Sequence, residues 1–209
     1  MVQTIQTRDI SLYELEENFG LELVTNSNFF PEWIENLPLL TDIEKSSLER
    51  VKSNYSNLTK RRPMSEEVVK MVVLSPLLDL AGFYQPNFEI KTETSTEISA
   101  VDESVIIVKG SIDVLVGNRR LWILAIESKN TKFDVISALP QALAYILDTP
   151  NAERPTFGLL VNGREFVFVK LVQSQKPKYA RSDALSIEKP NEIQQVLSVL
   201  KRFSELILL

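Results

Sequence analysis

Three charged residues interrupt a stretch that otherwise reads as two buried β-strands, residues 110–130. Asp113 lies inside the first apolar run, and Glu127 and Lys129 follow directly on the second. Burying a charge costs free energy unless the group is paired or holds a metal. Two carboxylates held together repel each other, and a divalent cation would neutralise them. A lysine beside them can orient or deprotonate an attacking water, which is chemistry suited to phosphodiester hydrolysis.

A purely structural interpretation of the same residues is equally open at this point. Asp113 or Glu127 could form an ion pair with Lys129 at a strand end and take part in no reaction. The types of the residues favour neither interpretation over the other.

Strand spacing decides whether these groups can meet. Side chains alternate between the two faces of a strand, so Glu127 and Lys129 share a face. A three-residue hairpin loop, 118–120, would pair Asp113 with Ala125 and so place it on that face. A two-residue loop would place Asp113 on the opposite face and exclude the site. We therefore predict a loop with an odd number of residues, or a bulge that restores the same parity.

Composition restricts the possible chemistry further. The 209 residues include no cysteine and no histidine. This excludes disulfides, thiolate zinc sites, cysteine nucleophiles and Ser-His-Asp triads. Oxygen ligands remain, and they favour Mg²⁺ or Mn²⁺. The formal net charge of −5 argues mildly against binding nucleic acid through bulk electrostatics, but it allows a local basic rim.

The remaining composition is that of an ordinary globular protein. Hydrophobic residues make up 44% and charged residues 24%, so a packed core is expected. No apolar run approaches the roughly 20 residues that span a bilayer. The polar, acidic start of the chain has no signal-peptide pattern. These features predict a cytoplasmic protein with no membrane partner.

The N-terminal segment, residues 1–62, is predicted to be helical and packed on the core. Residues 1–10 are expected to be loosely attached or disordered. Thr41, with Glu44 three residues later, predicts a helix start with a capping box. The segment contains no catalytic signature, so we expect it to cover one side of the core; a partner-binding arm is the alternative.

The next predicted helix begins at Ser65, a good N-cap residue. Glu66 and Glu67 suit the positive end of its dipole. Pro76 predicts a kink or break near Leu74. On propensity alone the two glutamates are plain helix-terminal acids, although Glu66 shares a stripe with apolar residues that face the core.

The remaining elements alternate as in an α/β protein. Gly110 is expected to mark a bulge or bend before Asp113. An Asn162-Gly163 pair is a strong hairpin signal. The order predicts a mixed sheet flanked by helices on both faces. The expected ranges are 88–99 and 104–109 for strands, 134–147 for a helix, 155–172 for the hairpin and 191–208 for a closing helix.

In this order, the features resemble the PD-(D/E)XK nucleases over residues 63–170. Asp113, thirteen intervening residues and then Glu127-Ser128-Lys129 match the motif on two strands of a hairpin. The segment SEEVVKMVVLSPLLDLAGF is similar to the first core helix of the nuclease domain of type I restriction motor subunits. Gln141 and Tyr145 resemble the Gln-xxx-Tyr motif of exonuclease-like members; by themselves they could equally be a hydrogen bond on a helix surface.

The resemblance implies a role for each matched residue. Asp113, Glu127 and the backbone carbonyl of Ser128 would bind Mg²⁺ or Mn²⁺. Lys129 would position the attacking water. Glu66 would hold a water beside the metal or a second ion, with Glu67 as the fallback. Gln141 and Tyr145 would line the side that faces DNA.

It also implies a restriction-endonuclease-like core in residues 63–209, and a Mg²⁺-dependent DNA endonuclease that would belong to a restriction or defence system. A single site cuts one strand, so a homodimer or a larger restriction complex is expected for double-strand cleavage. The alternative is a catalytically inactive nuclease-fold module that binds DNA or a protein partner. A third interpretation is a structural interaction domain whose aromatic N-terminal half binds a partner. Two departures are Ile112 in place of the motif's proline and a chain too short to contain a helicase motor.

Overall fold

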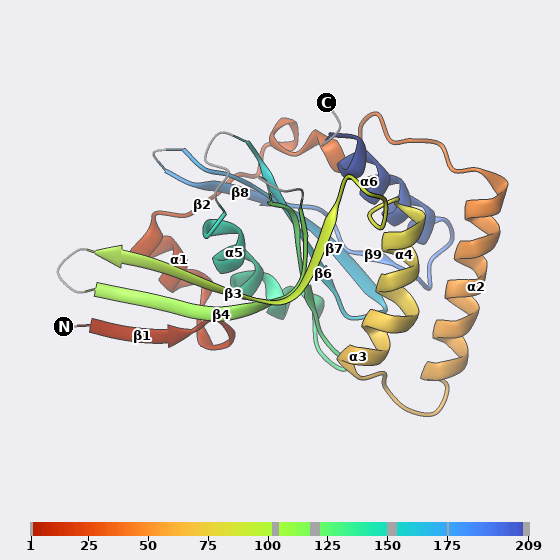
Figure 1. The fold of residues 1–209 in the computed structure, drawn as a ribbon, viewed down its shortest axis with the longest axis horizontal. Coiled ribbons are helices and arrows are strands. Elements are labelled where there is room, and N and C mark those ends of the chain that lie inside the picture. The colour runs from red at the N-terminus through yellow and green to blue at the C-terminus, as the bar shows by residue number, and fades with distance from the viewer. Residues whose placement is uncertain (1, 102–104, 118–121, 150–153, 175, 207–209) are drawn as a thin grey trace.

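A mixed β-sheet runs through the molecule (Figure 1). The computed structural model describes residues 2–101, 105–117, 122–149, 154–174 and 176–206. The strands pair in the order β1-β4-β5-β6-β7-β8-β2, with β3 on β4 and β9 on β7. The strands are β1 (Val2–Gln6), β2 (Glu22–Leu23), β3 (Glu89–Val101), β4 (Val105–Gly117), β5 (Trp122–Ser128), β6 (Thr156–Val161), β7 (Glu165–Val172), β8 (Lys178–Arg181) and β9 (Leu185–Ser186).

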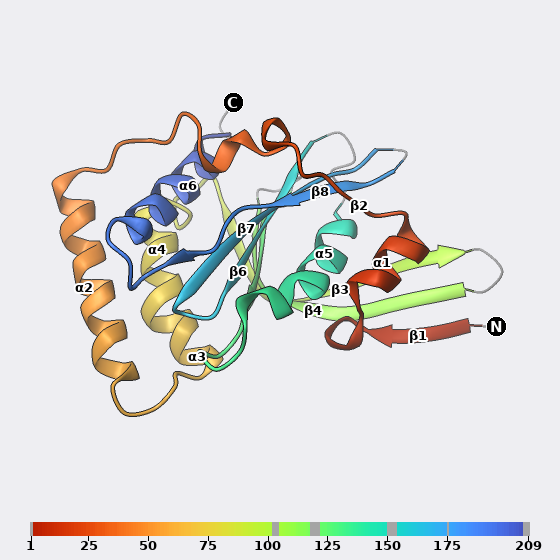
Figure 2. The same ribbon diagram turned by 180° about the vertical axis from the view of Figure 1, so that it is seen from behind.

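Helices cover both faces of this sheet (Figures 1 and 2). One apolar cluster packs α2, α3, α4 and α6 against the first face, and a second packs α1 and α5 against the other. This arrangement confirms the predicted mixed sheet flanked by helices. The longer helices are α1 (Leu12–Phe19), α2 (Asp42–Thr59), α5 (Leu139–Leu147) and α6 (Glu192–Leu206), and the shorter ones are η1 (Thr7–Asp9), η2 (Ser27–Phe29), η3 (Pro31–Trp33), α3 (Glu66–Val69), η4 (Lys70–Leu74), α4 (Ser75–Leu80) and η5 (Val135–Ala138).

The N-terminal segment differs from the prediction because it contributes strands as well as helices. β1 pairs with β4 in parallel, and β2 pairs with β8 in parallel. The prediction that residues 1–10 are loosely attached is therefore wrong, and residues 1–62 are only partly helical. Such short strands contain too few residues to show the alternation of apolar and polar side chains from which a strand is predicted. The capping box of Thr41 and Glu44 at the start of α2 is confirmed.

The helix that begins after Ser65 changes its winding near the predicted position. Ser65 caps it as predicted, by accepting a hydrogen bond from Val68 N. η4 is a π-helical turn, in which Ser75 N donates to Lys70 O. Pro76, the next residue, lacks an N–H and crowds the turn before it, and the wider π turn accommodates both effects. The break therefore spans the whole turn before Leu74, and it places Lys70 at its first position.

Gly110 lies within β4 without a bulge. It pairs with Thr96, and the register with β3 continues unchanged on both sides of it. The bulge that was one of the two expectations for this residue is therefore wrong. A glycine is needed here because Thr7 lies against it: an added Cβ would stand 1.9 Å from Thr7 Oγ1.

The C-terminal half follows the predicted order closely. β6 and β7 form the hairpin around Asn162-Gly163, with Gly163 at φ 85°. Asp134 caps a short 3-10 turn that leads into α5. β8 and β9 were not predicted. No helix among the described residues is both long and apolar enough to cross a membrane.

Candidate active site

Asp113 and Glu127 lie on the same face of the sheet. Val114 pairs with Ile126 and Leu115 with Ala125; the pairing ends at Val114, and the same register carried one residue further sets Asp113 opposite Glu127. The predicted partner of Asp113, Ala125, is therefore wrong by two residues, while the predicted parity is confirmed.

A bulge accounts for this parity. The register between β4 and β5 shifts between Val116 and Gly117, and Gly117 then pairs with Trp122. This is the bulge that the parity condition allowed. The three-residue loop proposed for 118–120 lies outside the described residues.

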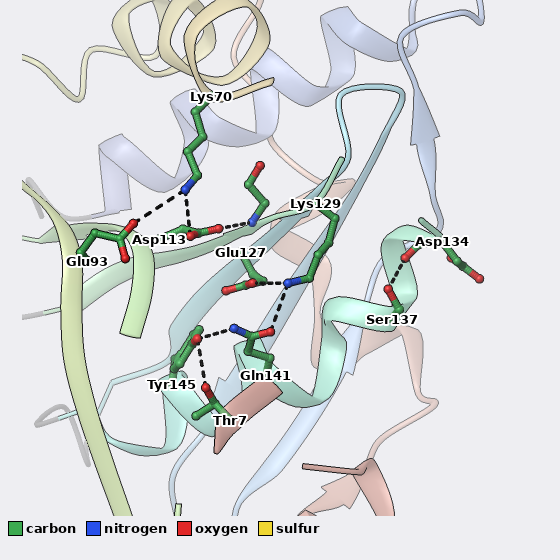
Figure 3. Close-up of polar contacts among 11 residues, drawn as sticks. Thr7, Lys70, Glu93, Asp113, Glu127, Lys129, Asp134, Ser137, Gln141 and Tyr145 are labelled. Atoms are coloured by element: carbon green, nitrogen blue, oxygen red, sulfur yellow. Dashed lines mark hydrogen bonds and ion pairs between the residues drawn. The ribbon is translucent and has the colours of Figure 1, made fainter. Parts of the chain in front are cut away.

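The site lies beside residues 110–113 of β4, a short stretch between the part that pairs with β1 and the part that pairs with β5. β1 pairs with residues 105–109 of β4 and β5 pairs with residues 114–117, so neither register reaches residues 110–113. Asp113 is the last residue of this interval. The backbone N–H of Ser128 at the end of β5 and the side chain of Lys70 in η4 both reach its carboxylate (Figure 3).

Both oxygens of Asp113 accept hydrogen bonds. Oδ2 accepts one of 2.8 Å from the backbone N–H of Ser128. Oδ1 accepts one of 2.9 Å from Lys70 Nζ, as Figure 3 shows. The Asp113 side chain is only 14% exposed. Asp113 is thus fixed to the end of β5 on one side and to the π turn on the other.

Glu127 is more deeply buried and only half satisfied. Its side chain is 3% exposed, and Oε1 accepts a hydrogen bond of 2.7 Å from Lys129 Nζ. Oε2 is buried and has no hydrogen-bond partner among the described residues. Burial and the neighbouring charge of Asp113 raise the pKa of Glu127 to about 7, although Lys129 opposes the shift.

Lys129 is held by a chain of hydrogen bonds that reaches the N-terminal segment. Its Nζ also donates to Gln141 Oε1 at 3.2 Å, and Gln141 Nε2 donates to Tyr145 OH at 2.5 Å. Tyr145 OH shares a hydrogen bond of 3.3 Å with Thr7 Oγ1 (Figure 3). Burial, with the charge of Glu127, raises the pKa of Tyr145 to about 12, so this hydroxyl stays protonated.

The structure brings Gln141 and Tyr145 to the site, with different exposure. Gln141 is partly exposed and bonds Lys129 directly, whereas Tyr145 is 1% exposed. Tyr145 therefore acts on the site through Gln141, and any direct contact with nucleic acid would require the hydrogen bonds to Gln141 and Thr7 to open. Contact between Gln141 and DNA stays a prediction.

The two helix glutamates, Glu66 and Glu67, differ in burial and in the groups that their charges affect. Glu66 is partly buried, and its charge contributes to raising the pKa of Glu127. Glu67 is exposed, and a backbone hydrogen bond and a bond with Ser65 lower its pKa. Of the two, only Glu66 contributes to the raised pKa of Glu127, and its task at the site stays a prediction.

Two residues of the site were missed from the sequence, Lys70 and Glu93. Lys70 Nζ lies 3.9 Å from Glu93 Oε1 in addition to its bond with Asp113. Burial pulls the pKa of Lys70 down, but the hydrogen bond and charge of Asp113 outweigh it and the pKa is raised. A cation one turn after Glu66 in an apolar helix was a usable signal. Nothing in the Thr-rich strand around Glu93 indicated its part.

The oxygen donors suit a hard divalent cation, but they are few. The described residues contain no group of three or more His, Cys, Asp or Glu side chains that could hold a metal. Two carboxylates and the Ser128 carbonyl would be the first donors, with water completing the shell. The unpartnered Oε2 of Glu127 fits this use. Lys70 Nζ already bonds Asp113 Oδ1, one of the oxygens that would bind the cation.

Comparison with solved structures finds a remote likeness. No protein-family model matches the chain, and no curated protein matches it. The chain is similar to a solved fragment described as an HsdR subunit of a type I restriction enzyme from Vibrio vulnificus YJ016, with a TM-score of 0.41 and 17% sequence identity. The likeness covers 66% of this chain and 26% of that one, so this chain spans about a quarter of its length. At this similarity the residues of the site must carry any functional conclusion.

Proposed function

We propose that this chain is a Mg²⁺-dependent DNA endonuclease of the restriction-endonuclease-like type. The observation that carries the proposal is the buried Glu127 carboxylate beside Asp113, with Oε2 lacking a partner among the described residues. An anionic oxygen left unpaired in the interior costs free energy, and a bound cation would remove that cost. Lys129 does not remove it, because it bonds the other oxygen.

Each residue then has a task. Asp113, Glu127 and the Ser128 carbonyl would hold Mg²⁺. When bound, Mg²⁺ would lower the pKa of a water and stabilise charge on a phosphoryl oxygen. Lys129 would orient the attacking water, and its bond to Gln141 keeps the ammonium at the site if Glu127 turns toward the metal. Glu66, on the facing helix, would hold a further water.

DNA as the substrate rests on the resemblance of the motif and its flanking helices. A restriction or defence role, in a homodimer or a larger complex, follows from the same resemblance. Mn²⁺ should replace Mg²⁺, because both accept oxygen ligands in octahedral geometry.

Nicking of supercoiled plasmid tests the proposal. Wild type should nick in Mg²⁺ or Mn²⁺ and not in EDTA. Asp113→Ala and Lys129→Ala should each lower the rate by at least about 100-fold. Lys109→Ala is the matched control, because it removes an ion-paired lysine from β4 outside the site. Nicking that survives both site substitutions would contradict the proposal.

One observation favours the inactive nuclease-fold module as a second candidate. Lys70 bonds Asp113 where a metal would be expected, so the site is already partly neutralised. DNA binding without nicking, in both metals, would assign this second function. Binding should then be as strong in Asp113→Ala as in wild type.

A further inference from the structure

Lys70 holds a carboxylate that the proposed function assigns to a metal. Its Nζ donates to Asp113 Oδ1 at 2.9 Å, and its side chain is 25% exposed. The second oxygen of Asp113 is taken by Ser128 N. A cation that binds Asp113 must therefore displace one of these two donors. The backbone N–H belongs to a paired strand, whereas the lysine side chain can move.

A second carboxylate stands within reach of the same ammonium. Glu93 Oε1 lies 3.9 Å from Lys70 Nζ. Thr92 pairs with Val114 and Thr94 with Ile112, so Glu93 stands across from Asp113 on β3. A rotation of the last bonds of the Lys70 side chain would suffice to transfer its main contact from Asp113 to Glu93.

The backbone at Glu93 is unusual for a strand. Its φ is 50°, a left-handed conformation that costs free energy in a residue with a side chain. Glu93 also accepts a hydrogen bond from Ser111 Oγ at 3.4 Å, which holds its carboxylate at this edge. The side chain is 70% exposed, so an ammonium moved to it would remain hydrated. Strain of this kind persists where the surroundings impose it, and here it sets an acid beside Lys70.

Charge counting supports a movable lysine. Lys70 and Lys129 balance the two paired acids, Asp113 and Glu127, when all four are ionised, and Glu66 is a further acid nearby. A divalent cation added at Asp113 would be repelled by an ammonium on the same carboxylate. Moving Lys70 outward lowers that repulsion and leaves the inner pair of acids for the metal.

We propose that Lys70 is a built-in counter-cation that occupies Asp113 in the metal-free protein and transfers to Glu93 when a divalent cation binds. This inference rests on the proposed metal site and states how its occupancy is controlled. Lys70 competes with the metal, and Glu93 lowers the cost of displacing it. The resting site therefore keeps its two paired acids balanced and has a reduced affinity for metal.

Calorimetric titration with Mn²⁺ tests the competition without any measurement of cleavage. Lys70→Met should bind Mn²⁺ at least about tenfold more tightly than wild type, because the competing charge is gone. Lys109→Met removes the same charge from an ion pair elsewhere on β4 and should match wild type within about twofold. Lys70→Gln gives a second variant should the methionine disturb the fold, and thermal melts establish that each variant is folded.

A double-mutant cycle tests the role of Glu93. Glu93→Gln should weaken Mn²⁺ binding about threefold in wild type and have little effect when Lys70 is already methionine. Equal weakening in both backgrounds would mean that Glu93 acts only through its own charge, which overturns the transfer.

The outcomes separate this inference from the metal site itself. Mn²⁺ binding that Glu127→Ala weakens but that neither Lys70 variant tightens would overturn the counter-cation and leave the site intact. Absence of Mn²⁺ binding in wild type and in both Lys70 variants would overturn the metal site, and the inference with it.

Discussion

The ion pairs Glu127–Lys129 and Glu32–Lys170 have similar geometry but different surroundings. The first joins Oε1 to Nζ at 2.7 Å and the second at 2.5 Å. Both glutamates leave a buried Oε2 without a partner among the described residues. A buried lysine–glutamate pair is therefore not in itself a sign of an active site.

The two pairs differ in what else surrounds the charges. Lys170 also donates to the Phe29 carbonyl at 2.9 Å and lies over the Phe29 ring, 5.4 Å from its centroid. These contacts fasten the N-terminal segment to β7. At the other pair a second carboxylate, Asp113, adds to the burial that raises the pKa of Glu127 to about 7. A second acid and a movable lysine distinguish the candidate site from the fastening pair.

Replacing the glutamate of the fastening pair should have the largest effect. Glu32→Gln leaves Lys170, whose side chain is 10% exposed, without its counter-charge. We expect the free energy of unfolding to fall by about 3 kcal/mol. Urea denaturation at pH 7 measures it, with the exposed Glu205→Gln as a control that should change little. A loss below about 1 kcal/mol would show that Lys170 is satisfied by Phe29 alone.

Glu127→Gln, the same substitution at the candidate site, should raise the free energy of unfolding instead of lowering it. Folding raises the pKa of Glu127 from 4.5 to about 7, so the unfolded chain ionises at lower pH than the folded one. The contribution of the Glu127 carboxyl group to the free energy of unfolding is fully present below pH 4.5 and is lost as the pH rises through about 7. Glu127→Gln has no carboxyl group to ionise here, so it avoids this loss. In the absence of metal it should be more stable than wild type at pH 8, by at most about 3 kcal/mol.

Urea denaturation in EDTA at pH 8 and pH 4.5 measures the effect. The gain of Glu127→Gln should vanish at the lower pH, while the deficit of Glu32→Gln should persist at pH 8. A gain independent of pH would show that packing, not ionisation, distinguishes the two glutamates.

The two ion pairs differ in how far they could be predicted from the sequence. Glu127 and Lys129 are two residues apart on one strand, so their common face follows from strand geometry alone. Glu32 and Lys170 are 138 positions apart and meet only because the N-terminal segment packs on β7. Lys70 and Glu93 meet through the register of β3 with β4 and the π turn; the position of Lys70 one turn after Glu66 was a weak local signal, and Glu93 had none.

The fold was predictable where periods are long and turn signals are strong. α2, α5, α6 and the hairpin around Gly163 follow from capping residues, apolar stripes and an Asn-Gly turn. β1, β2, β8 and β9 are two to five residues long and acquire their conformation from neighbouring strands. Short edge elements of this kind depend on tertiary contacts that a local pattern does not contain.

Gly110→Ala should disturb the support of Lys129 and leave the fastening pair intact. The new Cβ would collide with Thr7, whose hydroxyl bonds Tyr145. We expect a loss of about 2 kcal/mol in the free energy of unfolding, from overpacking. A Thr7→Gly/Gly110→Ala double variant should lose less than the two single losses added. Simple additivity would mean that the collision is relieved elsewhere.

The smallest expected change, Tyr145→Phe, tests whether the hydrogen-bond chain behind Lys129 matters to the site rather than to the fold. It leaves Gln141 Nε2 and Thr7 Oγ1 without their shared partner, which should cost about 1 kcal/mol. Tyr179→Phe is the matched control, because Tyr179 is equally buried but its hydroxyl makes no hydrogen bond with the described residues.

The two tyrosine variants should differ more in the site than in stability. With Tyr145 OH absent, Gln141 is free to turn, and Lys129 keeps only the bond to Glu127 that metal binding would weaken. Plasmid nicking should therefore slow by about tenfold in Tyr145→Phe and stay at the wild-type rate in Tyr179→Phe. Equal rates in the two variants would show that Glu127 alone positions Lys129, and the distinction between the two ion pairs would then rest on Asp113.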